Sequence, residues 1–367
     1  MLCLLGSLLL IACGTQAQEV VIPELDLAFD ADTIRMSPEA ERYVEAAVDL
    51  MRKDALYKKE IDFERVHQAI RFYADEAKVV SDTYFAIDKA LALLKDHHSS
   101  FLTPEVLTEA LGLNKDDVES LRQGRAPHID PSKIQDLAST LNFAQGKLVN
   151  QTIGYLSVPS FEKLYAEEMT FFADSLQNII KSLDENNLKG WIIDVRDNDG
   201  GADMPMIAGL GPLLDKENSY YGIDESGTVR TQSYYQDGAY YNLENQTDSA
   251  AIPIVETTTN YKLINPGLPI VVLTSKKTAS SAEAIVAIFQ EQENVTIVGE
   301  KTNGLTTVNS FNFLEDNAVL NLTMAHYANR NKKLLIQGIP PDVEVTPSEK
   351  AKADVVMQKA IELLEAN

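Results

Sequence analysis

A strand that runs through a serine directly into a helix is the feature that most constrains this chain. The strand is predicted from the apolar, β-branched run at residues 269–273, and the helix from the apolar run at 284–289. Between them lies the sequence TASSAE, residues 278–283. Such a junction has free backbone N–H groups and the positive end of a helix dipole, which together stabilise negative charge on a nearby carbonyl oxygen. Serine is also a preferred structural N-cap, and this segment taken alone favours the cap.

The C-terminal part of the chain repeats this alternation of strands and helices. The patterns predict a strand at 153–158, a long helix at 161–184, a strand at 191–195, a helix that starts within 203–214, a strand at 296–298, and further strands within 305–336. Residues 191–195 are mostly apolar, which is typical of a strand buried on both faces of a parallel sheet. We therefore expect an α/β fold with a mostly parallel sheet.

The N-terminal part has a helical period instead. Ser37-Pro38-Glu39 combines a cap, a proline in the first turn and an acid near the helix dipole, which predicts a helix start. Two more helices are predicted, one beginning near Asp62 and one over about 81–94. Three short helices with brief connections favour a small antiparallel bundle.

These patterns divide the chain into consecutive segments. We expect a signal region of the lipoprotein type at 1–17, a lead-in at 18–36, a helical module at 37–110, an irregular connection at 111–150, an α/β domain at 151–348 and a C-terminal helix at 349–367. Within the α/β domain, residues 216–262 are rich in Tyr, Asn and Gly, which predicts a surface excursion with hairpins.

Composition excludes several classes of protein. The 367 residues include 32 basic and 55 acidic side chains, for a net charge of -23, which argues against nucleic acid and anionic membrane surfaces as partners. Cys3 and Cys13 are the only cysteines, so the rest of the chain has no disulfide and no cysteine nucleophile. The five histidines form no H-E-x-x-H pair, and we expect neither a metal nor a cofactor.

The first residues are typical of a targeting signal. Their apolar run is too short for a stable transmembrane helix but has the length of a signal peptide core. Leu10-Ile11-Ala12-Cys13 resembles the bacterial lipobox, in which the cysteine, here Cys13, becomes the lipidated first residue. We expect a lipoprotein of the bacterial cell envelope, periplasmic or on the cell surface and favouring the outer membrane, which contacts the membrane only through this anchor. Cleavage after Ala17 and secretion is the alternative.

Four other segments have patterns that can support chemistry: DVRDNDGG at 194–201, DHHS at 96–99, VGEKTNG at 298–304 and GIPPDVEV at 338–345. A glycine pair after a buried strand permits positive φ and an anion-binding nest of N–H groups. A neutral imidazole suits proton removal from a serine hydroxyl. Taken singly, the glycine pair favours an ordinary strand-to-helix turn, and the histidine pair favours a structural position at the surface.

Taken together and in this order, the segments resemble the tail-specific or C-terminal processing family of serine peptidases. That family includes the core domain of tricorn protease and the repeats of the interphotoreceptor retinoid-binding protein. The shared motifs are D-x-R-x-N-x-G-G, T-x-S-x-A-E, G-E-x-T-x-G and G-I-x-P-D-x-E-V, and the resemblance covers about residues 37–110 and 150–350. It implies a crotonase- or Clp-protease-like ββα spiral after a helical module, with peptides or unfolded proteins as substrates.

The resemblance also implies residue roles. Ser280 matches the nucleophile, and the N–H groups of Ser281 and of Gly200 or Gly201 match the oxyanion hole. The lysine base of the processing-peptidase branch would fall at position 305, which is Leu305. No PDZ-like insert is evident either, so the chain is more similar to the tricorn-like branch. There the motif D-x-H-[ST] supplies a histidine base, which places His98 in that role.

The group that orients His98 is left open by the sequence. Ser99, Glu283 and Glu300 are the candidates, because the Glu of tricorn-like members before the terminal motif is Leu335 here. The function favoured is a serine endopeptidase that works through a Ser280 acyl-enzyme with His98 as base. The alternative is a catalytically weakened member that binds peptides or hydrophobic ligands. A crotonase-like acyl-CoA enzyme ranks third, because it needs no strand–serine–helix nucleophile.

Overall fold

The structure is a computed structural model that describes residues 35–129, 143–244, 253–347 and 353–366. The expected lipobox at Cys13, the signal region and most of the lead-in lie outside these residues. The chain forms two compact units. The first contains the described residues up to Arg125 together with Val308–Ala325, and the second contains Ala126–Thr307 and the chain from His326 onward.

The helical bundle of the first unit begins where the sequence predicts. Helix α1 (Pro38–Asp54) is capped by Ser37, whose Oγ accepts from the amide of Ala40, and α2 (Phe63–Tyr73) is capped by Asp62. Helix α3 (Tyr84–Leu91) is shorter than predicted, because 3₁₀ turns flank it at η2 (Val80–Thr83) and η3 (Ala92–Leu94). A π-turn at η4 (Val106–Ala110) and helix α4 (Lys115–Arg122) follow.

A hairpin from late in the chain completes this unit. Strands β11 (Thr307–Phe313) and β12 (Val319–Ala328) pair with each other, and β12 pairs antiparallel with β1 (Ser100–Leu102). The turn between them carries Asp316, whose carboxylate accepts hydrogen bonds from Tyr43 at 2.8 Å and Tyr84 at 2.5 Å. Leu320 of β12 belongs to the same hydrophobic core as the helices. Residues 308–325 therefore fold with the helices, although the sequence pattern grouped them with the α/β segment.

The second unit is built on a mostly parallel sheet, as predicted. Its strand order is β13-β10-β9-β4-β3-β2. The strands are β2 (Gln145–Val149), β3 (Ile153–Ser157), β4 (Gly190–Asp194), β9 (Ile270–Thr274), β10 (Val295–Gly299) and β13 (Val343–Glu344), and only the β2–β3 pair is antiparallel. Every residue of β4 and β9 is buried, in keeping with helices on both faces of the sheet.

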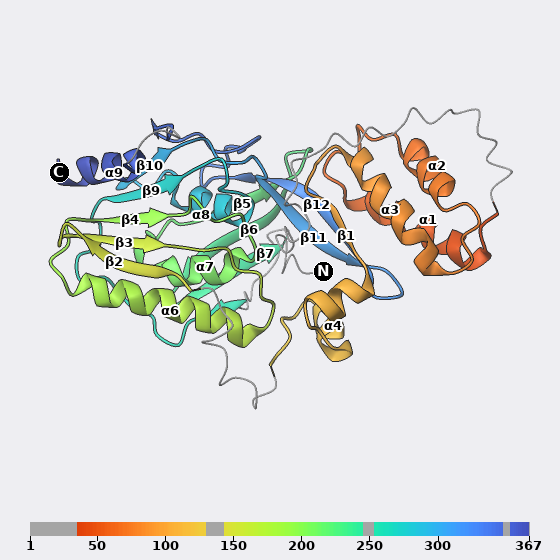
Figure 1. Cartoon of the computed structure of the whole chain (residues 1–367), viewed down its shortest axis with the longest axis horizontal. Helices are drawn as coiled ribbons and strands as arrows, with labels where there is room; N and C mark the ends of the chain where they lie inside the picture. The colour runs from red at the N-terminus through yellow and green to blue at the C-terminus, as the bar shows by residue number, and fades with distance from the viewer. Residues whose placement is uncertain (1–34, 130–142, 245–252, 348–352, 367) are drawn as a thin grey trace. The chain divides into compact units, whose positions relative to one another are not determined.

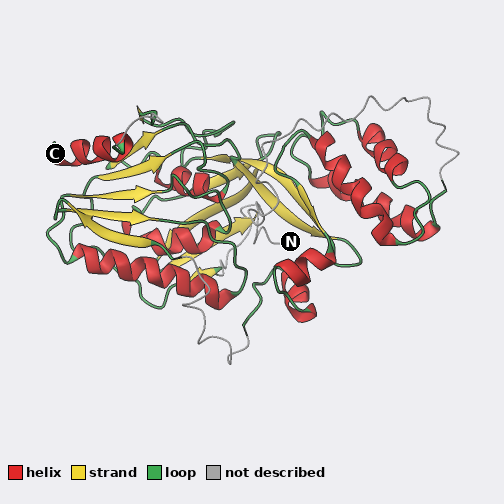
Figure 2. Ribbon diagram, viewed as in Figure 1, coloured by secondary structure: helices red, strands yellow, loops and turns green. Residues whose placement is uncertain are grey.

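Helices cover both faces of this sheet (Figures 1 and 2). Helix α9 (Val355–Glu365) packs Ala360 and Leu364 against Ile192 and other residues of the strands. Helix α6 (Ala166–Asp184) and helix α7 (Asp203–Leu210) lie on the other face, with η6 (Gly211–Leu213) after α7. Helix α8 (Ser281–Phe289) is buried at all its positions, which is the pattern of a core helix.

The Tyr-rich segment 216–262 forms the predicted hairpins but is less superficial than its composition suggests. Strands β5 (Tyr220–Ile223), β6 (Val229–Gln236), β7 (Ala239–Glu244) and β8 (Val255–Glu256) make an antiparallel meander. Strand β5 also pairs with the last three residues of β12, from His326 onward, which belong to the second unit. Tyr220 and Tyr240 are buried and both donate their hydroxyls to the carboxylate of Asp203. The buried tyrosines satisfy their polar atoms through an acid on α7.

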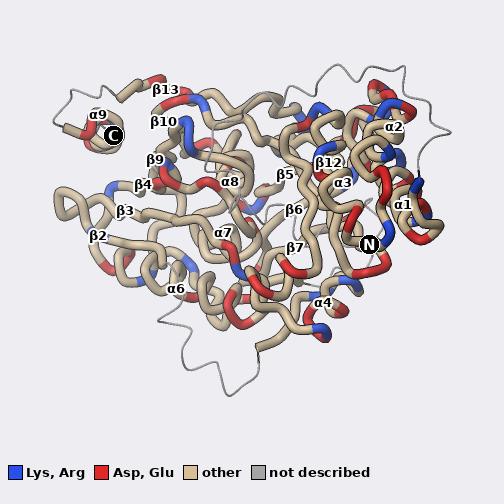
Figure 3. The backbone as a smooth tube through the Cα atoms, turned by 45° about the vertical axis from the view of Figure 1, so that its right-hand side comes forward, with Lys and Arg blue, Asp and Glu red and all other residues tan. Residues whose placement is uncertain are grey.

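Acidic residues are spread over many elements, not gathered on one (Figure 3). Among the residues that the structure describes, none of the helices combines the length and apolarity needed to cross a membrane.

We predict that Phe172→Ala will destabilise the second unit by about 3–5 kcal/mol, because it leaves a cavity in the core. Phe172 is 0% exposed and its ring lies 4.7 Å from that of Phe161, measured between centroids. The neighbouring Phe171 is 39% exposed, so Phe171→Ala is the matched control and should cost less than about 1 kcal/mol. Denaturant unfolding of both variants measures the difference, and equal losses would contradict it.

Candidate active site

The site is built where two neighbouring parallel strands end. Strands β4 and β9 pair in parallel, so the loops that follow them leave the same edge of the sheet. Hydrogen bonds join the two loops: Thr278 Oγ1 donates to the carbonyl of Val195 at 2.9 Å, and the Ala279 amide donates to the carbonyl of Asn198 at 3.2 Å. The T-x-S-x-A-E and D-x-R-x-N-x-G-G motifs, far apart in sequence, are thereby brought together.

Ser280 occupies a strained turn at the start of α8. Its φ of +52° and ψ of −115° are uncommon for a residue other than glycine. Holding such a conformation costs on the order of 1–3 kcal/mol, and strain of this kind concentrates at functional sites. A Cβ on Gly200 would lie 3.1 Å from the Cβ of Ser280, which is a tight contact, and Gly200 has a φ of +130°, so glycine suits this close approach of the neighbouring loop.

Two main-chain amides beside Ser280 remain available. Gly201 has a φ of +102° and accepts a hydrogen bond at its carbonyl oxygen from Ser281 Oγ, which joins the two segments. Within the described residues, neither the Gly201 N–H nor the Ser281 N–H has a hydrogen-bond acceptor. The Gly200 N–H does, because it donates to Asn198 Oδ1 at 2.9 Å. Of the two candidate glycines, Gly201 is therefore the one whose amide is available for an oxyanion.

Asn198 is a structural member of the site that the sequence reasoning missed. Its side chain is fully buried, and its Nδ2 donates to the carbonyls of Val158 at 3.2 Å and Pro159 at 3.1 Å. The motif arginine is anchored too, because Arg196 Nη2 lies 2.7 Å from a carboxylate oxygen of Asp194. The polar positions of the motif thus hold the shape of the glycine turn.

The candidate acids Glu283 and Glu300 have clear partners in the second unit. Glu283 Oε2 accepts from the Ser280 amide at 2.9 Å, and its Oε1 accepts from Thr302 Oγ1 at 2.5 Å and the Gly304 amide at 2.9 Å. Glu300 lies 3.4 Å from Lys276 Nζ in an ion pair.

His98 lies in the first unit, in a turn organised by Asp96. Oδ1 of Asp96 accepts from the main-chain amides of His98 at 2.9 Å and Ser99 at 2.7 Å, and its Oδ2 accepts from Ser99 Oγ at 2.7 Å. The hydroxyl proton of Ser99 is therefore directed at Asp96. Asn309 Nδ2 donates to the His98 carbonyl at 2.9 Å. The D-x-H-[ST] motif is a side-chain-to-backbone turn that holds the histidine in place.

The environment keeps the His98 imidazole neutral. Burial lowers its pKa to about 4, and the carboxylate of Asp96 acts in the opposite direction. Since the ordinary pKa of histidine is about 6.5, His98 is unprotonated at neutral pH and able to accept a proton.

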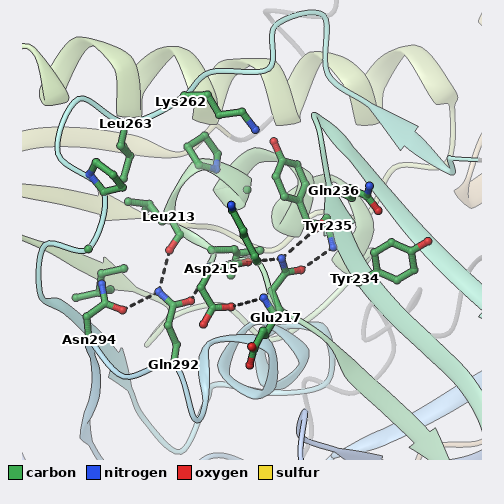
Figure 4. Close-up of a pocket in the computed structure, with 18 of the residues that line it drawn as sticks. Leu213, Asp215, Glu217, Tyr234, Tyr235, Gln236, Lys262, Leu263, Gln292 and Asn294 are labelled. Atoms are coloured by element: carbon green, nitrogen blue, oxygen red, sulfur yellow. Dashed lines mark hydrogen bonds between the residues drawn. The ribbon is translucent and has the colours of Figure 1, made fainter.

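A large cavity lies elsewhere in the second unit (Figure 4). It measures about 1040 Å³ and is lined by Trp191 and Ile270, near the starts of β4 and β9, whereas Ser280 follows the end of β9. In Figure 4, the side-chain amide of Gln292, one of the lining residues, donates hydrogen bonds to the Leu213 carbonyl and to Asn294 Oδ1. The cavity thus lies away from the candidate nucleophile. No cluster of metal-binding side chains occurs in the described ranges.

A strained serine at a strand-to-helix turn, beside two available amides, is the arrangement of a serine-type hydrolase. The sequence profile of Peptidase family S41 matches residues 152–345, which is more than half of the chain. The chain belongs to peptidase family S41, a family of serine-type peptidases.

Relatives with known names agree with this family. The chain is 29% identical to the nisin-resistance protein of Lactococcus lactis subsp. lactis over 164 residues, which are 44% of this chain and 48% of that protein. It is 25% identical to the carboxy-terminal processing protease CtpA of Bacillus subtilis over 207 residues, which are 56% of this chain and 38% of that protein. The matched part is thus less than half of either relative.

Solved structures share the fold. A lipoprotein from Streptococcus agalactiae superposes with a TM-score of 0.64 at 22% identity, over 90% of this chain and 97% of that one. The photosystem II D1 C-terminal processing protease superposes with a TM-score of 0.55 at 17% identity, over 89% of this chain and 98% of that one. The predicted α/β fold class and the predicted family are confirmed.

We predict that Gly201→Ala will destabilise the second unit by at least about 3 kcal/mol. A Cβ there would lie 2.0 Å from the Phe161 carbonyl oxygen, so the backbone must move. Gly227 also has positive φ but has open space around it, so Gly227→Ala isolates the conformational penalty of about 1 kcal/mol. Chemical unfolding of both variants tests this, and equal destabilisation would remove the packing argument.

We predict that His98 titrates with a midpoint near 4 and not near 6.5. Burial disfavours the imidazolium, so the ring stays neutral until the solution is strongly acidic. Two-dimensional NMR of the imidazole, with the resonance assigned by its loss in His98→Ala, measures the midpoint. A midpoint of 6 or above would show that the ring is more solvated than its surroundings here indicate.

Proposed function

We propose that this protein is a serine endopeptidase that cleaves peptide bonds through an acyl-enzyme on Ser280, with His98 as the base. The observation that carries the proposal is the strained turn of Ser280 beside the available amides of Gly201 and Ser281. This arrangement aims main-chain donors at the place where negative charge would develop.

The proposed reaction has two stages. Ser280 Oγ attacks the peptide carbonyl carbon while His98 takes the hydroxyl proton, and the N–H groups of Ser281 and Gly201 bind the oxyanion. The peptide C–N bond then breaks, and His98 returns the proton to the leaving amine. Water, deprotonated by the same imidazole, hydrolyses the ester and frees Ser280.

The pairing of His98 with Ser280 is a proposal from chemistry, since the two residues belong to different units. It is supported by the neutral state of His98 and by the absence of a lysine at position 305. Asp96, the first residue of the D-x-H-[ST] motif, fixes the His98 backbone. In this proposal the imidazole ring of His98 is oriented by Ser99 or by an acid such as Glu300.

We further propose peptides or unfolded protein segments as substrates and a lipid anchor at Cys13 in the bacterial cell envelope, with plain secretion as the alternative. The names of the relatives, a nisin-resistance protein and carboxy-terminal processing proteases, support a peptide substrate. The lipobox-like sequence supports the anchor, as does the structural likeness to a streptococcal lipoprotein.

We predict that Ser280→Ala and His98→Ala will each abolish covalent labelling by a fluorophosphonate probe and cleavage of fluorescent casein. Each variant removes a group that forms or breaks a bond, so a loss of at least about 10³-fold is expected. The control is His97→Asn, because His97 is exposed and its φ of +58° suits asparagine. Circular dichroism checks folding.

Different results lead to different conclusions. If folded wild-type protein neither labels nor cleaves, the alternative of a peptide- or ligand-binding family member replaces the peptidase. If His98→Ala labels at the wild-type rate, another residue is the base.

A further inference from the structure

We propose that Glu283 is a positioning residue that holds the Ser280 amide in its strained turn and ties that turn to the loop after β10. The inference rests on the proposed function, because it assigns Glu283 a task in aligning the nucleophile. It differs from the sequence expectation, in which Glu283 was a candidate for orienting His98.

The carboxylate of Glu283 joins segments that are distant in sequence. Its Oε2 accepts from the Ser280 amide at 2.9 Å, whereas its Oε1 accepts from Thr302 Oγ1 at 2.5 Å and the Gly304 amide at 2.9 Å. Residues 302–304 belong to the G-E-x-T-x-G motif, which has no other role in the proposed chemistry. Glu283 thus links the nucleophile turn to a second motif.

The direction of these hydrogen bonds is set by a further contact. Thr302 Oγ1 accepts from the amide of Ile339 at 2.7 Å, so its own proton is left for Glu283. Ile339 lies in the G-I-x-P-D-x-E-V motif near the end of the chain. One relay therefore runs from that motif through Thr302 and Glu283 to the Ser280 main chain.

Because the relay is buried, each of its polar atoms needs a hydrogen-bond partner within the protein. Glu283 is 0% exposed. Its carboxylate is faced by hydrogen-bond donors, which are the amides of Ser280, Gly304 and Leu305 and the hydroxyl of Thr302. Both terminal atoms of the side chain must therefore accept hydrogen bonds. A carboxylate meets this need with its two oxygens, whereas a primary amide has one oxygen and one NH₂ donor. Glu283→Gln would turn an NH₂ group toward one of these donors and leave it unpaired.

An ordinary N-terminal helix acid does not explain this arrangement. A surface capping box satisfies helix amides at little desolvation cost. Here burial raises the pKa of Glu283 to about 7, and the hydrogen bonds to Thr302, Gly304 and Ser280 oppose that rise. Retaining an acid in so unfavourable a place fits a task at the adjacent strained serine.

The test compares Glu283→Gln with Glu293→Gln. Glu293 is exposed beyond the end of α8, so its replacement removes the same charge without touching the relay. We expect Glu283→Gln to lower kcat on fluorescent casein and the rate of fluorophosphonate labelling about 10²-fold per folded molecule, with KM nearly unchanged. We expect Glu293→Gln to match wild type. Calorimetry gives the folded fraction.

The pH profile of the wild type is an independent readout. The carboxylate is the positioning form, so kcat should rise as pH increases through about 7, while the profile of Glu283→Gln stays flat there. Titration of His98 near pH 4 lies well below this range. If Glu283→Gln does not fold, Thr302→Val takes its place, because it removes one donor to Glu283 and leaves the carboxylate: a lower labelling rate per folded molecule supports the proposal, and a wild-type rate overturns it.

The remaining outcomes separate the two proposals. A folded Glu283→Gln variant that labels and cleaves at the wild-type rate, with only a lower melting temperature, would show that the residue is structural. In that case the loss of labelling in Ser280→Ala would still support the peptidase. If Ser280→Ala itself cleaves casein like wild type, the proposed function fails, and the positioning role fails with it.

Discussion

The parallel pairing of β4 and β9 is the constraint from which the rest of the site follows. Parallel neighbours end at the same edge of a sheet, so the loops after them must pack together. Here one loop carries the glycine turn and the other carries Ser280. Their contact is close enough that a Cβ on Gly200 would crowd Ser280, and it is held by Thr278 Oγ1 and by the Ser281 hydroxyl.

The site concentrates features that oppose stability. Ser280 has an unfavourable backbone conformation, and Glu283 is an acid in the protein core. Each is retained by its surroundings: buried helix α8 fixes the turn, and donors from separate segments satisfy the carboxylate. Stabilising interactions elsewhere in the second unit, such as the Phe172 core, offset this cost, so the folded protein can hold the strained turn.

Much of this could be predicted from local patterns. The caps at Ser37 and Asp62 predicted the starts of α1 and α2, and the apolar runs predicted β4 and β9, because these signals act within a few residues. The start of α6 at Ala166 could not be predicted. Residue Phe161 was expected in that helix, but its backbone pairs with the Gly200–Gly201 turn, a long-range contact that overrides helical propensity.

The sequence by itself determined the α/β class, the order of the motifs and the identity of the candidate nucleophile, because these depend on residue type and spacing. Only the tertiary structure decided which amides remain available and where Glu283 points. It also decided that residues 308–325 fold with the helices, through Asp316 and Leu320. The physical reason is that hydrogen-bond partners and burial depend on chain segments far apart in sequence, and no local pattern specifies which of them will meet.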